Sequence, residues 1–146
     1  MITELTRMWL TRSTKPFLFK KEYDQELPFS DCDGLGLYVH IPFCRSICSF
    51  CPYCKTLYSE EACSRYIDAL IREIHLAGSQ IPGKKIVTSL YFGGGTPALA
   101  ADRIKEIIDA IQEHFIITQG IGIELHPENI TPRTLHILKE AGITKL

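Results

Sequence analysis

The sequence LYVHIPFCRSICSFCPYCK, residues 37–55, decides how the rest of the chain is interpreted. It begins as a short apolar segment typical of a strand and continues into a loop with four of the chain's six cysteines, Cys44, Cys48, Cys51 and Cys54. A structural zinc site usually takes its ligands from two pairs of residues separated by a dozen or more positions. Here the first three thiols follow a C-x3-C-x2-C spacing within one loop. This spacing favours an iron–sulfur cluster, which has several metal corners.

The number of closely spaced thiols bears on what such a cluster would do. A 4Fe-4S cluster held by four cysteines is coordinatively closed and suits electron transfer. Cys44, Cys48 and Cys51 supply three thiolates, so one iron would stay open for a small molecule, as catalytic metal sites keep a position open. The spacing therefore indicates catalysis. A zinc knuckle with a structural role is the alternative, and the ligand spacing argues against it.

Composition and charge narrow the function classes. The 146 residues are 45% hydrophobic and carry a formal net charge of −1, which offers no basic surface for a phosphate backbone. Six cysteines without a secretory signal or a membrane-length apolar run argue for a reducing compartment and against a disulfide framework. We predict a cytoplasmic protein of one domain, or part of one, with no nucleic-acid partner and no membrane span.

Predicted strands and helices alternate from residue 34 onward. Strands are predicted at 35–41, 86–92 and 120–125, and helices at 60–77, 102–115 and 132–141. Ser59 and Thr131 are the expected N-caps, while Gly78 and Gly142 are the expected helix stops. This alternation predicts an α/β fold of three strand–helix units with a parallel sheet, and residues 143–146 resemble the beginning of a fourth strand.

Residues 1–33 show no sustained hydrophobic period. We expect them to form an N-terminal arm that covers one end of the core, and the alternative is a segment that contacts substrate or a partner. Cys32, in this arm, and Cys63, in the first helix, are interpreted as spare or buried thiols.

Three motifs follow directly after the three predicted strands. They are the cysteine loop, the GGGTP run at 93–97 and the ELHPE segment at 124–128. Ligands of parallel α/β folds gather at the carboxyl ends of the strands, so we expect the motifs on one rim. The glycines would let backbone groups contact a ligand directly, and the alternative is a tight turn stiffened by Pro97. Glu124 would point into a barrel interior and need a polar partner there; the alternative is a salt bridge at the rim.

The motif HIPFC, followed by C-x3-C-x2-C with Phe50 before the third cysteine, resembles the cluster loop of radical S-adenosylmethionine (radical SAM) enzymes. It is most similar to the oxygen-independent coproporphyrinogen III oxidases and their haem-chaperone relatives, over residues 34–146. The resemblance implies the N-terminal half of a partial (β/α)6 barrel, from a truncated gene or one half of a split protein. It also implies two cofactors, a 4Fe-4S cluster and S-adenosylmethionine, which the cluster cleaves to give a 5′-deoxyadenosyl radical.

The resemblance assigns a role to each matching position. Cys44, Cys48 and Cys51 would hold the cluster, and the backbone of Gly94, Gly95 and Thr96 would bind the amino group of the methionine moiety. Glu124 matches the glutamate of an E-x-x-P segment that binds the adenosyl ribose.

Two aromatic side chains also match family positions. Tyr38 matches a tyrosine that contacts the cofactor near the cluster, and Phe50 packs beside the adenine or the cluster in relatives. Both could equally be core side chains, as aromatic residues more often are. His40, on the same strand face as Tyr38, is expected to orient a carbonyl beside the cluster or the substrate.

Cys54 departs from the pattern of the oxidase subgroup. In that subgroup an extra cysteine follows the third ligand two residues on, whereas here it follows three residues on. A fourth thiolate that reached the open iron would close the cluster, and the alternative is a free thiol with a role on the substrate side.

The resemblance also implies a reaction and its partners. The reaction is oxidative decarboxylation of porphyrinogen propionates, and the alternative is a haem chaperone-like protein without decarboxylase activity. The implied partners are a small-molecule substrate, with a porphyrinogen as the candidate, and reduced flavodoxin or ferredoxin as electron donor.

Overall fold

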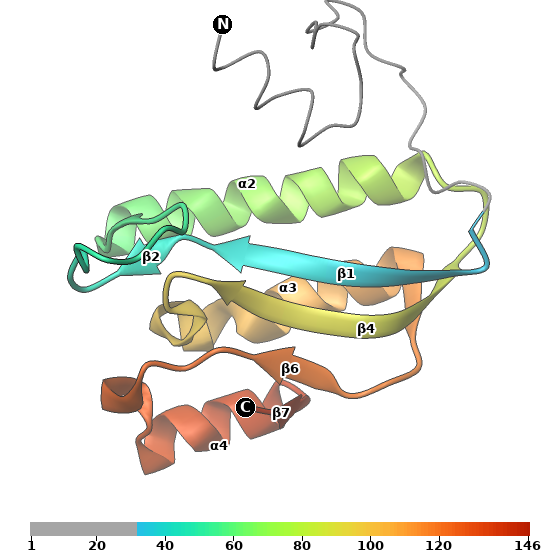
Figure 1. Ribbon diagram of the computed structural model, residues 1–146. Coiled ribbons are helices and arrows are strands. Elements are labelled where there is room, and N and C mark those ends of the chain that lie inside the picture. Colours follow the sequence, from blue (N-terminus) through green and yellow to red (C-terminus); the bar gives the residue numbers. More distant parts are fainter. Residues whose placement is uncertain (1–31) are drawn as a thin grey trace, which may run out of the picture.

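A computed structural model of the chain describes residues 32–146, so the arm expected at 1–33 lies outside the described residues apart from its last two positions. The main sheet is entirely parallel, with strand order β1-β4-β6-β7 and β5 paired alongside β4 (Figure 1). Its strands are β1 (Gly34–Ile41), β4 (Lys85–Gly94), β5 (Phe115–Ile117), β6 (Ile121–Ile123) and β7 (Ile143–Lys145). The expected α/β fold with parallel strand–helix units is confirmed.

Three helices connect these strands. They are α2 (Glu60–Ser79), α3 (Ala101–His114) and α4 (Pro132–Glu140), with short 3-10 turns η1 (Pro97–Ala100) and η2 (Pro127–Asn129) before the last two. Helix α3 packs between α2 and α4. The expected N-caps are confirmed, because the Ser59 side chain accepts a hydrogen bond from the Ala62 N–H and the Thr131 side chain accepts one from the Thr134 N–H. None of the helices in residues 32–146 is long and apolar enough to cross a membrane.

The core lies between the helices and one face of the sheet. Its fully buried side chains are Ile41, Ile67, Val87, Leu90, Phe92, Ile104, Ile107, Ile111, Ile123 and Leu138. They come from strand positions two apart, except where β1 and β4 shift register between Val87 and Ser89, and from helix positions three and four apart. This is the pattern of elements that bury one face. Removal of this apolar surface from water is the main force that holds the helices on the sheet.

Some boundaries differ from the sequence-based expectation. Gly78 does not stop the first helix, which continues to Ser79 with Gln80 as its C-cap. A glycine inside a helix needs a packing reason, and here it makes room for a ring of the neighbouring helix, described below. Strand β4 extends through Gly93 and Gly94, and Phe115 opens β5, a short strand that the sequence analysis missed.

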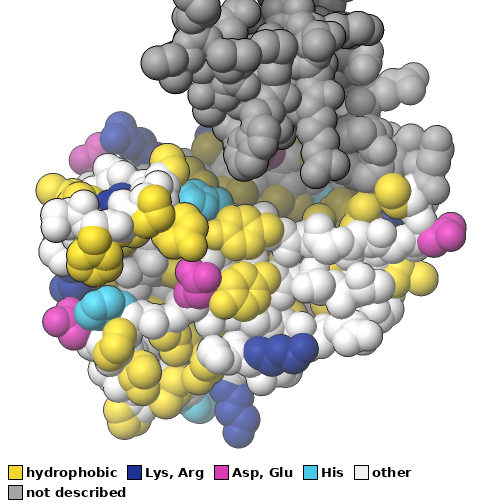
Figure 2. All heavy atoms as spheres, viewed as in Figure 1, with side chains coloured by type: hydrophobic (Ala, Val, Ile, Leu, Met, Phe, Trp, Pro, Cys, Tyr) yellow, Lys and Arg dark blue, Asp and Glu magenta, His cyan; other side chains and the backbone are white. Residues whose placement is uncertain are grey.

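The second face of the sheet is open in the described part of the chain. Figure 2 shows hydrophobic side chains exposed on it beside acidic ones. Tyr38 of β1 is aligned with Tyr91 of β4, Tyr91 with Gly122 of β6, and Gly122 with Lys145 of β7. Tyr38 keeps 59% and Tyr91 39% of its surface exposed. This face corresponds to the interior of the barrel that the sequence predicts.

Gly142 ends α4 with a φ of 96°, where only open space surrounds the Cβ position. Gly142→Ala should therefore lower the free energy of unfolding by about 1 kcal/mol, through backbone strain alone. Gly36→Ala is the matched control, because its Cβ would also meet open space but its backbone carries no such positive φ. Urea denaturation measures both, and equal losses would contradict the strain argument.

Candidate cofactor site at the carboxyl ends of the strands

The cysteine loop is closed at its base by a small two-stranded sheet. Strand β2 (Phe43–Cys44) pairs in parallel with β3 (Thr56–Leu57). The Thr56 N–H donates to the Pro42 carbonyl at 2.8 Å, and the Tyr58 N–H donates to the Cys44 carbonyl at 2.9 Å. Residues 45–55 therefore form a loop whose two ends are held together at the carboxyl end of β1.

All four thiols of the loop are free, with Cys48 and Cys54 exposed and Cys44 and Cys51 half-buried. The Cys51 N–H donates to the Cys48 carbonyl at 3.3 Å, and the Lys55 ammonium donates to the Cys51 carbonyl. A backbone hydrogen bond from Tyr53 and the nearby Lys55 charge lower the pKa of the Cys51 thiol, while burial opposes them. A lowered pKa favours the thiolate, which is the form that binds metal.

The thiols are not gathered as a single metal ion would need. A tetrahedral zinc ion holds thiolate sulfurs about 3.8 Å apart. Among residues 32–146, no cysteine belongs to a group of three or more metal-binding side chains whose donor atoms all lie within 4.8 Å of one another. Three free thiols spread over one loop are instead a donor set that fits an iron–sulfur cluster, which is larger than one ion.

The N–H groups of Gly94, Gly95 and Thr96 are already hydrogen-bonded within the chain. Gly95 donates to the Ile41 carbonyl at 2.9 Å, and Thr96 donates to the Phe43 carbonyl at 2.7 Å. Gly94 donates to the Glu124 carboxylate at 3.3 Å. Any backbone contact from 94–96 to a ligand would therefore use carbonyl oxygens, of which that of Thr96 already accepts from the Leu99 N–H at 3.0 Å. Carbonyl oxygens bind hydrogen-bond donors such as an ammonium group.

The glycines are required by close approach as well as by backbone geometry. A Cβ at Gly95 would lie 2.6 Å from the Phe43 carbonyl oxygen and 2.9 Å from the Cys44 sulfur. Gly94 has a φ of 119°, and a Cβ there would lie 2.8 Å from the His40 ring. The run lies directly against the base of the cysteine loop, so a plain tight turn does not explain its composition.

Glu124 follows β6 and is exposed at the same edge. Its N–H donates to the Phe92 carbonyl at 2.9 Å, while its carboxylate accepts from the Gly94 N–H. The expected polar partner is therefore a backbone amide, and none of the ion pairs among residues 32–146 includes Glu124. The carboxylate links the second and third motifs.

The aromatic candidates lie outside the core. Phe50 is 86% exposed in the cysteine loop. The Tyr38 ring stacks on Tyr91, with 6.4 Å between centroids and 18° between planes. Burial and the negative charge of Glu124 raise the pKa of Tyr38, so its hydroxyl keeps its proton. Within residues 32–146, neither of these two side chains belongs to the core.

His40 contacts a carbonyl of the cysteine loop, which is the first of the two roles expected for it. Its Nε2 lies 3.0 Å from the Cys54 carbonyl oxygen, and because a carbonyl only accepts, this nitrogen must carry the proton. Tyr66 of α2 donates to the His40 carbonyl at 2.7 Å. These bonds fix the position at which the chain leaves the last cysteine of the loop.

The sequence analysis missed Tyr91, which belongs to the same surface. Positions 89, 91 and 93 of β4 share one face of the strand, so the alternation that placed Gly93 at the rim also placed Tyr91 below it. The signal was present in the period-two pattern of the strand.

The family model of the radical SAM superfamily matches residues 38–146, a span that includes every part of this rim. The chain belongs to the radical SAM superfamily. The family resemblance found in the sequence is therefore confirmed, and the strand–helix units are those of a partial radical SAM barrel.

Several characterised proteins are similar to this radical SAM chain. An oxygen-independent coproporphyrinogen III oxidase of Pseudomonas aeruginosa is 32% identical over 77% of the chain and 26% of its own length. An anaerobilin synthase of Escherichia coli is 44% identical over 75% of the chain and 25% of its own length. The haem chaperone HemW of Bacillus subtilis is 30% identical over 75% of the chain and 30% of its own length. The solved structure of coproporphyrinogen III oxidase (HemN) from Escherichia coli, described as a radical SAM enzyme, aligns with a TM-score of 0.69 at 33% identity, over 76% of the chain and 26% of HemN.

The contact between Gly95 and Cys44 generates a prediction about this rim. Gly95→Ala should lower the free energy of unfolding by about 1–3 kcal/mol, because the new methyl group meets the Phe43 backbone, which the Thr96 hydrogen bond holds in place. Chemical denaturation of the metal-free chain measures the loss. Gly36→Ala serves as control, since a Cβ there meets nothing within 4 Å. An unchanged stability for Gly95→Ala would show that the loop does not lie against the run.

Proposed function

We propose that this chain is the part of a radical SAM enzyme that binds a 4Fe-4S cluster and S-adenosylmethionine. The observation that carries the proposal is that a loop of free thiols, a glycine run and an acidic side chain meet at one sheet edge, joined by backbone hydrogen bonds. The chain spans 25–30% of the length of the relatives described above, so the reaction of a whole enzyme is also a proposal.

Cys44, Cys48 and Cys51 are the proposed cluster ligands. Their loop is closed at its base, and the Gly95 backbone lies next to the Cys44 sulfur, which fixes the first ligand against the sheet. When bound, such a cluster with one open iron supplies the electron that cleaves S-adenosylmethionine into methionine and a 5′-deoxyadenosyl radical.

The proposed cofactor contacts follow from the groups that remain accessible. Carbonyl oxygens of Gly94 and Gly95 would accept hydrogen bonds from the ammonium group of the methionine moiety, since their N–H groups are already used. The Thr96 carbonyl already accepts from the Leu99 N–H at 3.0 Å, so Thr96 would contribute through its second lone pair. The Glu124 carboxylate, held by one N–H, has lone pairs left for the ribose hydroxyls. Tyr38 and Phe50 offer exposed aromatic surface beside the same loop for the adenosyl group.

Cys54 is proposed to be a free thiol on the substrate side. Its carbonyl is held by His40, and its thiol is exposed at the end of the loop. This hydrogen bond fixes the backbone of Cys54 beside β1, and we assign the cluster to the three other cysteines of the loop.

We propose a tetrapyrrole as the substrate class, because the names of the similar proteins refer to a coproporphyrinogen, anaerobilin and haem. Oxidative decarboxylation of a porphyrinogen is the first candidate, supported by several oxidases among the relatives and by the HemN structure. Chemistry on haem is the second, supported by the 44% identity with an anaerobilin synthase. Reduced flavodoxin or ferredoxin would supply electrons, in the cytoplasm.

Cleavage of S-adenosylmethionine tests the proposal. After anaerobic reconstitution with iron and sulfide and reduction with dithionite, the chain should release 5′-deoxyadenosine, measured by liquid chromatography. Cys48→Ala should abolish the release, because two thiolates cannot hold the cluster. Cys32→Ala should retain it, since this exposed cysteine lies before β1 and outside the loop.

The outcome that contradicts the assignment is equal release from Cys48→Ala and from the unsubstituted chain. A cluster that forms but cleaves nothing in either the unsubstituted chain or Cys54→Ala would also contradict it. Release only from Cys54→Ala would show that the fourth thiolate closes the cluster, and would overturn the substrate-side role of Cys54.

Substrate preference separates the two candidates. The reconstituted chain should quench its Tyr fluorescence on addition of the preferred tetrapyrrole, because Tyr38 and Tyr91 line the open face next to the cluster loop. Tighter binding of coproporphyrinogen III than of haem, measured by titration under anaerobic conditions, is the result expected for an oxidase. The reverse order would favour the haem-directed candidate.

A further inference from the structure

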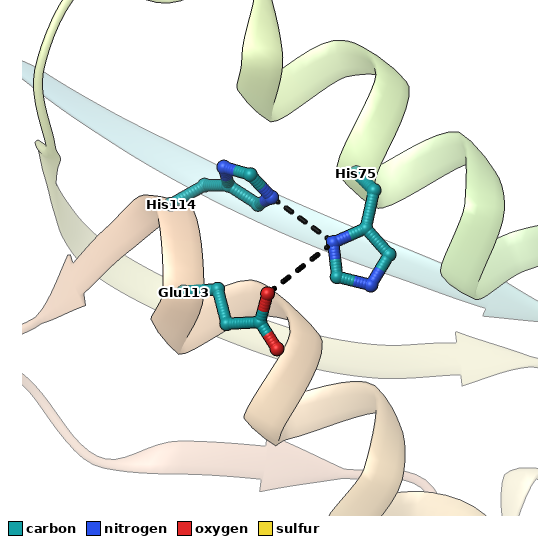
Figure 3. Close-up of side chains that lie close together, drawn as sticks. All are labelled: His75, Glu113 and His114. Atoms are coloured by element: carbon teal, nitrogen blue, oxygen red, sulfur yellow. Dashed lines mark hydrogen bonds and ion pairs between the residues drawn. The ribbon is translucent and has the colours of Figure 1, made fainter.

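Two histidines and a glutamate meet between α2 and α3, at the end of the helices away from the cysteine loop (Figures 1 and 3). The His75 Nδ1 lies 3.0 Å from the His114 Nε2 and 3.6 Å from a Glu113 carboxylate oxygen. All three donor atoms lie within 4.8 Å of one another. In residues 32–146 no other set of three metal-binding side chains meets so closely.

Hydrogen bonding alone does not satisfy these three groups together. His75 Nδ1 faces both an imidazole nitrogen and a carboxylate oxygen. If it carries a proton, it can donate fully to only one of them; if it does not, its lone pair faces the carboxylate. A cation placed between the three atoms would accept a lone pair from each.

The distances match those of a small metal ion. Zinc binds histidine nitrogen and carboxylate oxygen at about 2.0–2.2 Å, so tetrahedral geometry places its donor atoms about 3.3 Å apart. The two measured separations, 3.0 and 3.6 Å, lie on either side of this value.

The surroundings favour a cation. Helix α2 ends at Ser79 and α3 ends at His114, so the partial negative charges of two helix ends lie beside the two histidines and the glutamate. His75 and Glu113 keep 41% and 65% of their side-chain surface exposed, which leaves a path for the ion and room for a water ligand.

Gly78 explains how the rings come so close. A Cβ at this position would lie 2.2 Å from the His114 ring, so the absence of a side chain on α2 is what admits the ring of α3. This is the packing reason for a glycine inside α2, where a residue with better helix propensity would otherwise be expected.

We propose that His75, His114 and Glu113 bind a divalent transition-metal ion, zinc by ligand preference, which joins α2 to α3. Two imidazole nitrogens and one carboxylate oxygen are a common ligand set for zinc, with water as the fourth ligand. Three protein ligands plus water are the usual set of catalytic zinc sites. This site, however, lies near the amino ends of the strands, where barrel folds place residues that serve stability, so we assign it a structural role. It does not depend on the function proposed for the cysteine loop.

Zinc binding by matched variants tests this site. The anaerobic full chain, before and after cluster reconstitution, is dialysed against buffered zinc, and bound zinc is measured by mass spectrometry. The unsubstituted chain should hold one zinc more per chain than His75→Ala or His114→Ala, and Glu113→Gln should bind it at least about tenfold more weakly. His136→Ala is the control, because His136 is exposed on α4 and does not belong to the group formed by His75, Glu113 and His114.

Thermal unfolding supplies a second measurement. Zinc should raise the unfolding temperature of the unsubstituted chain and of His136→Ala, and raise it less in His75→Ala, because ligand that binds only the folded state stabilises it. All variants keep the same cysteines. Zinc bound by the cysteine loop, or failure of the iron–sulfur cluster to form, would therefore change the zinc content of every variant by the same amount. Circular dichroism checks that the variants fold, and Glu113→Gln retains both histidines if one of the histidine variants does not. Equal zinc content and equal shifts in all chains would overturn the proposal and leave the histidines as a hydrogen-bonded contact between helices.

Discussion

Two backbone hydrogen bonds hold the candidate cofactor site together. Gly95 and Thr96, which follow β4, donate to the carbonyls of Ile41 and Phe43, at the carboxyl end of β1. They fasten the base of the cysteine loop to the glycine run, and the absence of a Cβ at Gly95 lets the Cys44 sulfur lie beside it. The glycine run is therefore first a structural element of the loop, and its carbonyl oxygens are the groups left for a ligand.

Much of this arrangement follows from the sequence. Period-two strands, helices with apolar residues three and four apart, and the caps at Ser59 and Thr131 were enough to predict a parallel sheet with three motifs on one rim. Local signals did not reveal what depends on contacts between distant segments. Gly78 reads as a helix stop because its partner, the His114 ring, lies 36 positions along the chain in another element. The hydrogen-bond acceptors of the Gly95 and Thr96 N–H groups are likewise supplied by distant residues, the carbonyls of Ile41 and Phe43.

The sheet has two chemically distinct ends and two distinct faces. One face is covered by helices and forms the core, while the other exposes Tyr38 and Tyr91 below the rim. Cysteines, glycines and Glu124 gather at the carboxyl ends of the strands. The group formed by His75, Glu113 and His114 lies at the opposite end, between α2 and α3. Radical chemistry at the rim of the sheet and metal binding between α2 and α3 would therefore take place at opposite ends of the strand–helix layers, and each can be tested without the other.

The central claim is that Cys44, Cys48 and Cys51 hold a 4Fe-4S cluster with one iron open to S-adenosylmethionine. Electron paramagnetic resonance of the reconstituted, reduced chain, recorded before and after addition of S-adenosylmethionine, tests it most directly. We expect about four iron atoms per chain and a cluster spectrum that changes when S-adenosylmethionine binds the open iron. A 4Fe-4S spectrum that S-adenosylmethionine leaves unchanged, or a chain that holds no such cluster, would contradict the claim.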